Sequence, residues 1–245
     1  MTIRVGIGGW SYEPWEETFY PPKLATTKQL EYAASKVTAI EINATFYRTQ
    51  SATSFQKWAK ATPDDFMFSV KAPRAAVQRK DLREAAQSIE WFFNSGVGEL
   101  GSKLGPIFWQ MAPYKKFDAA EMNAYFDMLP EKLGKLKLRH AIEVRHDSFA
   151  CDEFMALARE RNIAVVTVES AKHPLTVEPT ADFAYARLEL TQAGEPTGYP
   201  KPALTKWLKT ARDWEKSGDV FLYFISGAKE RNPAAAQAML ELLKA

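Results

Sequence analysis

Eight short runs rich in β-branched and aromatic residues restrict the fold of this chain more than any other feature. They lie at Ile3–Ile7, Ala39–Ile42, Phe66–Val70, Pro106–Trp109, Ala141–Val144, Ile163–Val168, Phe183–Leu188 and Val220–Phe224. Strands that alternate with helical patterns are typical of parallel βαβ units. The chain has 245 residues, and a (β/α)8 barrel usually has about 250. The sequence therefore predicts an α/β fold, a (β/α)8 TIM-type barrel that forms a single domain over residues 1–245. An open doubly wound sheet is the alternative, because strand order alone does not establish closure.

Helical patterns follow seven of the eight predicted strands. The expected helices cover 27–35, 51–61, 81–94 and 118–129, and three more begin near Asp152, Pro202 and Pro233. Asp118 and Asp152 are expected N-caps, because a short carboxylate accepts hydrogen bonds from the free amides of the first turn. After the sixth strand the chain reads SAKHPLTVEPTAD. Its prolines predict that the sixth helix is reduced or missing.

Charge and cysteine content narrow the partners and the compartment. The net charge is +2, which gives no general reason to expect nucleic acid or an anionic membrane as partner. Cys151 is the single cysteine and the three histidines follow no metal-ligand spacing, so neither a disulfide nor a zinc site is expected. No apolar run approaches the roughly 18 residues of a membrane span, and no signal peptide precedes the first strand. A cytoplasmic location is expected.

Charged residues occur where side chains should face the barrel interior. Glu41 alternates with Ile40 and Ile42 on the second strand, and Glu143 lies between Ile142 and Val144 on the fifth. Successive side chains of a strand point to opposite faces, so the isoleucines and valine should face the helices and the carboxylates the interior. The same alternation places a polar set inside the barrel: Glu41, Asn43, Ser69, Lys71, Glu143, Arg145, Tyr185 and Arg187.

Several of these residues lie at the C-terminal ends of their strands, where (β/α)8 barrels bind ligands. We therefore predict a polar site at this mouth, with Glu41, Lys71, Glu143 and Arg145 as catalytic candidates. Strand ends and the following loops supply the expected ligand-binding residues: Trp10, Tyr12, Asn43, Thr45, Tyr47, Arg48, Arg74, Gln110, His146 and Arg187. The alternative is a buried lattice of ion pairs that fixes the barrel register and does no chemistry.

The first functional hypothesis is an enzyme acting on a small polar ligand that carries a phosphate or carboxylate. Lys71, Arg74, Arg145 and Arg187 would bind the anionic group, and Glu41 or Glu143 would act as general acid or base. A glycosidase with paired carboxylates is less favoured. Its two carboxylates would come from nearly opposite strands, with an expected gap beyond the roughly 5–5.5 Å of retaining enzymes.

Other function classes stay open. Basic residues interleaved with aromatic ones also suit a nucleic-acid-binding protein or phosphodiesterase, and a binding scaffold without turnover is a third class. Glu41, Glu143 and Glu169 offer oxygens to magnesium or manganese. Neighbouring Lys and Arg are expected to satisfy these carboxylates, so we expect no cofactor, and a divalent metal stays open as the alternative. The reaction class is not assignable from the residues.

Five motifs in order resemble those of one family. They are Gly8–Tyr12 with the following Trp15 and Phe19–Pro21, Glu41–Arg48, Phe68–Arg74, Leu104–Gln110 and Ile142–His146. Together they resemble the YecE-like family, a domain of unknown function, across nearly the whole chain. The resemblance implies a (β/α)8-type barrel and supplies no reaction. Three positions depart from the family pattern: Gln78 and Glu189, where histidines are frequent, and Ser226, where an Asn-rich turn is frequent. These departures weaken any scheme that uses those histidines as acid, base or metal ligand.

Overall fold

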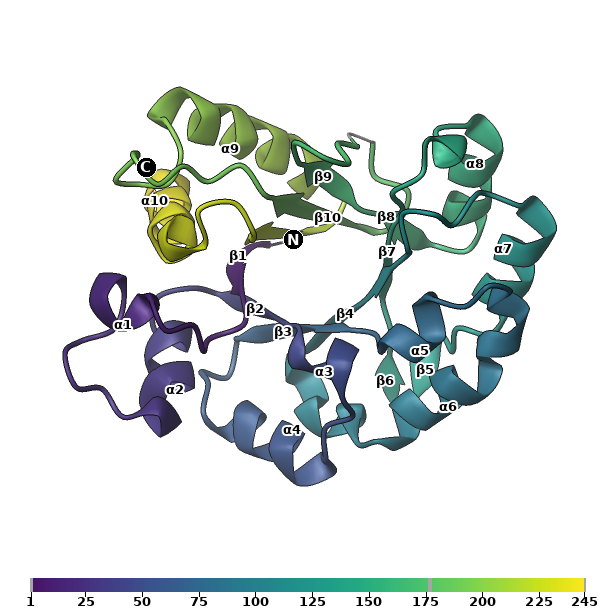
Figure 1. Cartoon of the computed structure of the whole chain (residues 1–245), viewed down its shortest axis with the longest axis horizontal. Helices are drawn as coiled ribbons and strands as arrows, with labels where there is room; N and C mark the ends of the chain where they lie inside the picture. Colours follow the sequence, from purple (N-terminus) through teal and green to yellow (C-terminus); the bar gives the residue numbers. More distant parts are fainter. Residues whose placement is uncertain (1, 176–177, 245) are drawn as a thin grey trace.

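Nine parallel strands form one sheet that curls into a nearly closed barrel with helices on its outside (Figure 1). The computed structural model describes residues 2–175 and 178–244. The strands are β1 (Ile3–Gly8), β2 (Ala39–Ile42), β3 (Met67–Lys71), β4 (Leu104–Gln110), β7 (His140–Glu143), β8 (Ile163–Val165), β9 (Thr167–Glu169), β10 (Phe183–Leu188) and β11 (Asp219–Phe224). Their order in the sheet is β8-β7-β4-β3-β2-β1-β11-β10-β9. The predicted (β/α)8 fold class is confirmed.

The two ends of the sheet are successive pieces of one segment. The predicted sixth strand divides at Val166 into β8, which pairs with β7, and β9, which pairs with β10. Beside β8, the Thr180 hydroxyl accepts a hydrogen bond from the Val165 amide (2.8 Å) and donates one to the Ile163 carbonyl (2.7 Å). Side-chain oxygen thus satisfies the backbone groups that β8 would otherwise offer to a neighbouring strand. Nine short strands therefore fill the eight strand positions of the barrel.

In the part of the chain that the structure describes, the outer layer consists of seven longer helices, with shorter ones near the strand ends. The longer helices are α2 (Gln29–Ala34), α4 (Ala52–Lys60), α6 (Ala86–Asn94), α7 (Ala119–Asp127), α8 (Asp152–Glu160), α9 (Lys201–Glu215) and α10 (Asn232–Lys244). The short α-helices are α1 (Trp15–Thr18), α3 (Ala44–Tyr47) and α5 (Arg74–Val77). Within the described residues, 3-10 helices lie at Thr26–Lys28, Leu82–Ala85, Val97–Lys103, Asp147–Phe149 and Lys229–Arg231.

Two predicted helix caps have different outcomes. Asp118 caps α7 as predicted, because its carboxylate accepts a hydrogen bond from the Glu121 amide (2.8 Å). The prediction for Asp152 is wrong: Cys151 occupies the N-cap of α8 and makes no side-chain cap bond. The helix begins one residue earlier than expected, so the Asp152 carboxylate lies in the first turn. There it interacts favourably with the positive end of the helix dipole but does not cap the helix.

The segment between β9 and β10 contains no helix among its described residues, which confirms that the sixth helix is missing. Residues 176 and 177 of this predicted loop lie outside the described residues. Leu175 instead forms an antiparallel bridge with Val168. The short helices α1, α3 and α5 were not predicted. Nor was a small hairpin of β5 (Lys132–Leu133) and β6 (Leu136–Lys137), which turns at Gly134 with φ of 60°.

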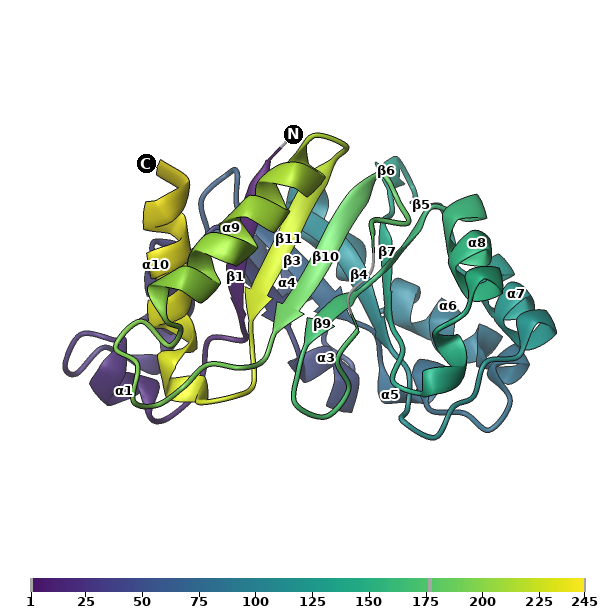
Figure 2. The same cartoon turned by 90° about the horizontal axis from the view of Figure 1, so that it is seen from above.

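Buried side chains form two layers, as strand alternation predicts. A smaller cluster inside the barrel consists of Ala39, Phe108, Ala141, Ala164, Val166, Val168, Phe183, Tyr185, Phe221 and Tyr223. The alternate residues Ile40, Ile42, Ile142 and Val144 belong to the larger cluster with the helix residues. Figure 2 shows the strands pointing toward one end of the barrel, where α1, α3 and α5 lie. This end, called the mouth below, is viewed from the front in Figure 1.

None of the helices in the described part of the chain combines the length and the apolar composition that crossing a bilayer requires.

Candidate functional site

Arg187 is the centre of a buried ionic cluster at the mouth. It comes from the end of β10, and its Nη1 lies 2.6 Å from Glu143 Oε2 and 2.9 Å from Glu189 Oε1. Its Nε also lies 3.3 Å from Glu41 Oε2. Glu41 comes from β2 and Glu143 from β7, so one guanidinium joins three non-adjacent strands. Because both glutamates are almost completely buried, this pairing is what makes their charges tolerable inside the barrel.

Glu143 is held by hydrogen bonds at both oxygens. Its Oε1 accepts from Arg145 Nε (2.6 Å) and from Gln110 Nε2 (2.8 Å), while Oε2 accepts from Arg187. Burial alone would raise the pKa of Glu143, but the nearby Arg187 and Arg145 outweigh burial and lower it. The carboxylate therefore stays ionised at neutral pH.

Glu41 is likewise fixed, since its Oε2 also accepts a hydrogen bond from the Tyr185 hydroxyl (2.7 Å). Burial, with a contribution from Glu41, raises the pKa of Tyr185, so this phenol stays protonated and keeps donating. Glu41 and Glu143 both form ion pairs with the guanidinium of Arg187, which lies between them. They do not flank an open space of the kind that a glycosidase needs for its sugar.

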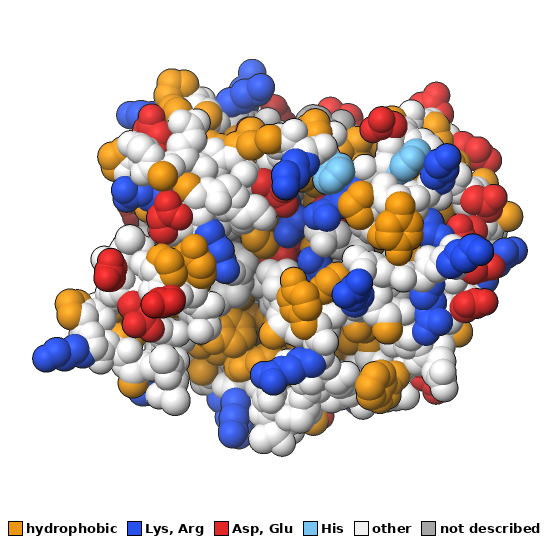
Figure 3. Space-filling view, viewed as in Figure 1, with side chains coloured by type: hydrophobic (Ala, Val, Ile, Leu, Met, Phe, Trp, Pro, Cys, Tyr) orange, Lys and Arg blue, Asp and Glu red, His pale blue; other side chains and the backbone are white. Residues whose placement is uncertain are grey.

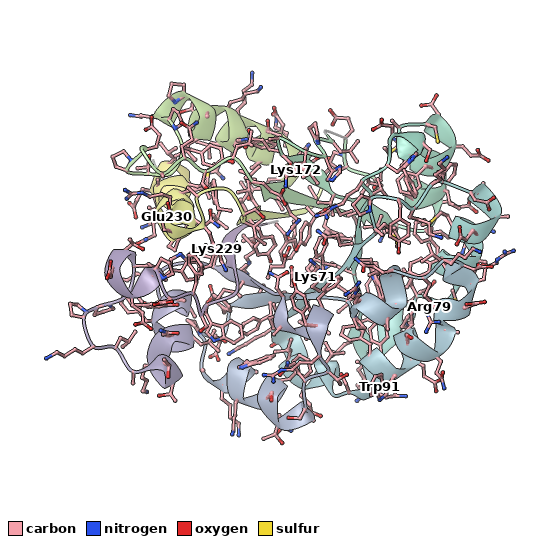
Figure 4. All side chains as sticks on the ribbon, in the orientation of Figure 1. Lys71, Arg79, Trp91, Lys172, Lys229 and Glu230 are labelled. Carbon is pink, nitrogen blue, oxygen red and sulfur yellow. The ribbon has the colours of Figure 1, made fainter. Side chains whose placement is uncertain are left out.

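Lys71 has a different environment from Arg187. It ends β3, and its side chain lies near the middle of the mouth (Figure 4). The ammonium donates to Gln110 Oε1 at 2.7 Å, and Nζ lies 4.4 Å from the ring centre of Phe46 and 5.6 Å from that of Phe108. No ion pair joins it to a carboxylate among the described residues. Burial, reinforced by the charge of Arg187, lowers the pKa of Lys71 from 10.5 to about 8.

Glu189 is the carboxylate nearest to solvent in the ionic cluster. It follows β10 and is only partly buried, whereas Glu41 and Glu143 are inaccessible. Burial raises its pKa, and Arg187 opposes that rise without reversing it. Two other departures from the family pattern also have defined places. Gln78 accepts a hydrogen bond from Arg74 Nε (2.7 Å), and Ser226 adopts a left-handed conformation with φ of 60°.

The aromatic first loop packs onto the barrel. Trp15 is fully buried and contacts Tyr12, Phe19 and Tyr20 ring to ring. Trp10 is half-buried and lies edge to face with Trp58 of α4 at 5.2 Å. Tyr12 is half-buried too, and the ammonium of Lys229 lies 4.1 Å from its ring centre. Trp10 and Tyr12 thus have protein partners on at least one face.

The predicted residues of the second and third loops are placed unequally. Thr45 is buried, and its hydroxyl donates to the Lys71 carbonyl (2.6 Å), so it supports the strand end. Asn43 donates to the Glu41 carbonyl (3.2 Å). Tyr47 has an exposed fraction of 81%, and Arg48 and Arg74 are exposed as well. The structure therefore brings Asn43 and Thr45 into the wall of the mouth and leaves the other three at its surface.

A cleft of about 160 Å³ opens beside Arg145. It is lined by Val144, Arg145, His146, Asp147, Phe149, Ala150, Lys172, His173, Pro174 and Leu175. His146 Nδ1 accepts a hydrogen bond from the Ser148 amide (3.1 Å), which leaves the proton of the neutral ring on Nε2. The space-filling view shows pale blue histidine and blue Lys or Arg side chains around a hollow near the middle of this face (Figure 3). Cations from two loops therefore gather beside the ionic cluster.

Size alone does not single out the mouth. A cavity of about 530 Å³, lined among others by Arg4, Lys36 and Lys244, lies at the opposite end of the barrel. Another of similar volume lies beside Lys80 and Tyr114. The mouth is the stronger candidate because buried charges with perturbed pKa values converge there, which is typical of functional sites.

The set proposed for a divalent metal does not form one group. Glu169 accepts hydrogen bonds from the Tyr199 hydroxyl (2.6 Å) and from Trp207 Nε1 (2.9 Å), away from the partners of Glu41 and Glu143. Within residues 2–175 and 178–244, no cluster of three or more His, Cys, Asp and Glu is arranged to hold a metal ion.

Several residues that shape this site were not predicted from the sequence. Lys172 and His173 closely follow β9, so their position after a strand end was the available signal. Phe108 and Phe46 are the rings beside Lys71, and Lys229 covers Tyr12. Aromatic residues give no sign in the sequence that a cation will lie over their rings.

Fold and site define an α/β barrel protein with a buried ionic cluster at its C-terminal mouth. The model of the family described as "Protein of unknown function DUF72" matches residues 4–245, and the chain belongs to this family. UPF0759 protein YunF of Bacillus subtilis (strain 168) is 28% identical over 183 residues. The match covers 72% of this chain and 61% of YunF, so the chain spans less than two thirds of that relative.

Solved structures with low sequence identity share the fold. A DUF72 family protein from Thermotoga maritima MSB8 is 21% identical, with both chains covered completely and a TM-score of 0.81. Another from Enterococcus faecalis V583 is 17% identical, with 100% of this chain and 98% of that chain covered and a TM-score of 0.76. SacUVDE is 12% identical, with 99% and 100% covered and a TM-score of 0.58. At these identities the likeness shows the fold alone.

Proposed function

We propose that the mouth binds a small polar ligand with a phosphate or carboxylate group and exchanges a proton with it through Lys71. The observation that carries this proposal is the pairing of Lys71. Lys71 is 8% exposed, and its ammonium donates to a neutral amide. A lysine held only for stability would be expected to face a carboxylate, as Arg187 does.

The anionic group of the ligand would lie between Lys71 and the cleft. Arg145 reaches both places, because its guanidinium contacts Glu143 and also lines the cleft with His146 and Lys172. Charged hydrogen bonds from Lys and Arg are the strong ones for phosphate and carboxylate. We therefore assign Arg145, His146 and Lys172 to binding.

Lys71 is a better proton-exchange group than either buried glutamate. Glu143 is ionised and already accepts three hydrogen bonds, so it has little tendency to take a proton. General acid–base catalysis works best when the pKa lies near the operating pH, and the pKa of Lys71 has moved toward that range. We assign Glu41 and Glu143 to positioning Arg187 and Arg145, in place of the acid or base role expected from sequence.

Calorimetric titration with inorganic phosphate at low salt tests the binding step. Wild-type protein should bind phosphate, and Lys71→Met and Arg145→Met should each weaken it about tenfold or more, because a charged hydrogen bond contributes about 1.5–3 kcal/mol. Lys57→Met on α4 and Arg161→Met after α8 remove the same charges at exposed or peripheral positions and should bind as wild type. Absence of binding to wild type at tens of millimolar phosphate would contradict the proposal.

Nucleic-acid binding is the second candidate, favoured by exposed aromatic residues after two strands. Tyr47 and Tyr114 have exposed fractions of 81% and 65%, and basic Arg48 and Lys116 lie near them in the chain. Such rings can stack bases while cations contact the backbone. Fluorescence anisotropy with a single-stranded oligonucleotide should then show binding that weakens steeply with salt. A flat salt response would count against this candidate.

We also propose a cytoplasmic location, supported by the single cysteine, Cys151.

We further infer that the YecE-like motifs and the DUF72 family describe the same group of proteins. A scaffold without turnover would bind phosphate with the same dependence on Arg145 but would convert no ligand, and its ligand binding would be the only functional property that Lys71→Met changes.

A further inference from the structure

The amine of Lys71 is the one strong nucleophile that the described structure places inside the mouth. Its neighbours are a side-chain amide and two aromatic rings, those of Phe46 and Phe108. Lysine becomes nucleophilic when desolvation or a nearby cation favours its neutral form. Both conditions hold here, because burial and Arg187 are the two largest causes of the lowered pKa of Lys71.

We propose that Lys71 forms a covalent imine with a carbonyl compound that carries an anionic group. The inference rests on the proposed function, because the anionic group would lie against Arg145 and the cleft while the carbonyl carbon reaches Lys71 Nζ. It adds the substrate class: an aldehyde or ketone with a carboxylate or phosphate.

The surroundings of Lys71 suit this chemistry in three respects. First, Lys71 Nζ lies 5.6 Å and the Arg187 guanidinium carbon 4.8 Å from the centre of the Phe108 ring, so a second cation lies near the amine. Second, the carboxylates of the ionic cluster bond to Arg187, Arg145, Gln110 and Tyr185, and not to Nζ. Third, the side chain lies near the middle of the mouth (Figure 4), where a ligand held by Arg145 would bring its carbonyl group.

The step balances without an external oxidant or reductant. The lone pair of neutral Lys71 attacks the carbonyl carbon, the C–N bond forms, and the oxygen takes up the proton released by nitrogen to give a carbinolamine. A second proton, from solvent at the rim, converts the hydroxyl into leaving water as the nitrogen pair forms the C=N bond. The product is a protonated imine plus one water, and hydrolysis reverses the step.

Reductive trapping with glyoxylate and cyanoborohydride tests the imine. Glyoxylate carries an aldehyde beside a carboxylate, and cyanoborohydride reduces an imine to a stable secondary amine. Near pH 7 the neutral fraction of Lys71 should exceed that of an unperturbed lysine by about two orders of magnitude, given its pKa of about 8 against 10.5. Peptide mapping by mass spectrometry should therefore find the first adduct on Lys71, before the surface lysines react.

Two variants make the result specific. Lys71→Arg keeps a cation but removes the primary amine, so the selective adduct should disappear, whereas Lys57→Arg should label as wild type. Circular dichroism and thermal unfolding of Lys71→Arg check that the barrel is intact. Early labelling spread over surface lysines with Lys71 unmodified would overturn the inference, as would unchanged labelling in Lys71→Arg.

The two proposals fail separately. If phosphate binds and depends on Arg145 but no adduct forms at Lys71, the imine is wrong and the binding function stands. If Lys71 is trapped selectively but phosphate does not bind, the nucleophile is real and the anionic group of the ligand is wrong. Excess phosphate should slow the trapping several-fold in wild type when both proposals hold, because the two anions compete for Arg145.

Discussion

Arg187 and Lys71 lie over the same ring, that of Phe108, yet the two sides of the mouth offer their charges different partners. Arg187 meets three carboxylates, which come from β2, from β7 and from the residue that follows β10. On the side of β3 and β4, Lys71 meets the neutral amide of Gln110. Burial is similar, so the difference lies in pairing and not in exposure.

The pKa values follow the pairing. Burial opposes the charge of Arg187, but Glu143 and Glu41 outweigh it and raise the pKa of Arg187 further. For Lys71 burial prevails and the pKa falls. A buried cation with carboxylate partners is a structural element, whereas one without them costs stability, and such strain is concentrated at functional sites. The comparison therefore assigns stability to one side of the mouth and reactivity to the other.

The largest expected effect is on the paired side. Arg187→Met leaves Glu41, Glu143 and Glu189 without their shared guanidinium, and breaking a buried pair costs about 3–5 kcal/mol. Urea unfolding at pH 7 should show this loss, and Arg187→Lys should recover part of it. A loss below about 1 kcal/mol, the range of surface ion pairs, would mean that the cluster is not a stabilising lattice.

The effect of acid on a buried histidine at the other end of β7 must be distinguished from its effect on the mouth. His140 accepts a hydrogen bond from Trp109 Nε1 (3.1 Å) on Nδ1 and contacts the Pro130 carbonyl through Nε2 (2.8 Å). Burial lowers the pKa of His140 from 6.5 to about 4. The unfolded chain therefore binds the proton first, and about 2–3 kcal/mol of stability should be lost as the pH falls from 6.5 to 4.

Urea unfolding across this pH range checks the prediction, with His140→Gln as the variant that cannot titrate. Glu143 also stabilises the folded protein, because its pKa is lowered from the ordinary 4.5. That stability is lost only as the pH falls below about 4.5, which is more acid than the range in which His140 acts. A pH slope between 6.5 and 5 that persists in His140→Gln would assign the acid lability to another group.

The inward face of each strand was predictable, but the partners across the barrel were not. Alternation along β2 and β7 placed Glu41 and Glu143 inside, because a period of two is a local property of a strand. Which residues meet across the axis depends on strand order and stagger. Arg187 therefore could not be recognised from the sequence as the shared partner of residues 44 and 146 positions away.

Loop residues were harder to predict than strand residues. Tyr47 and Arg48 adjoin strand β2 in sequence, yet the short helix α3 turns them to the surface. The hairpin of β5 and β6 has two-residue strands, too short for any periodic pattern to appear. Positions that depend on the turn of a short helix or hairpin are set by tertiary contacts, which sequence periodicity does not report.

Removing the charge of Lys71 should raise the free energy of unfolding, whereas removing that of Arg187 should lower it. The folded pKa of about 8 lies below the unfolded 10.5, so between these values the unfolded chain holds more protons and stability rises with pH. Below pH 8 the buried charge costs stability. Lys71→Met should therefore stabilise the protein at pH 7 by about 1–3 kcal/mol, while lowering phosphate binding.

Unfolding at two pH values provides the control for Lys71→Met. Urea unfolding at pH 7 and pH 10 should show the gain of Lys71→Met shrinking at the higher pH, where the wild-type amine is neutral when folded. Lys57→Met should differ from wild type by less than about 0.5 kcal/mol at both values, as surface substitutions do. A destabilised Lys71→Met would mean that Lys71 is paired like Arg187, and the two sides of the mouth would no longer differ.

The smallest expected effect is at the rim, where the ring of Tyr47 is exposed. Tyr47→Ala should change stability by less than about 0.5 kcal/mol and leave phosphate binding unchanged, because the ring donates no charge to the mouth. Trp91→Ala on α6, away from the mouth in Figure 4, is the matched removal of an exposed aromatic ring. One stacked base contributes about 1–3 kcal/mol to binding. If Tyr47→Ala lowers the affinity for an oligonucleotide by that amount and Trp91→Ala does not, the rim binds nucleic acid. If both variants bind the oligonucleotide with the same affinity, the rim does not bind nucleic acid, and the mouth binds only small anions, beside Lys71.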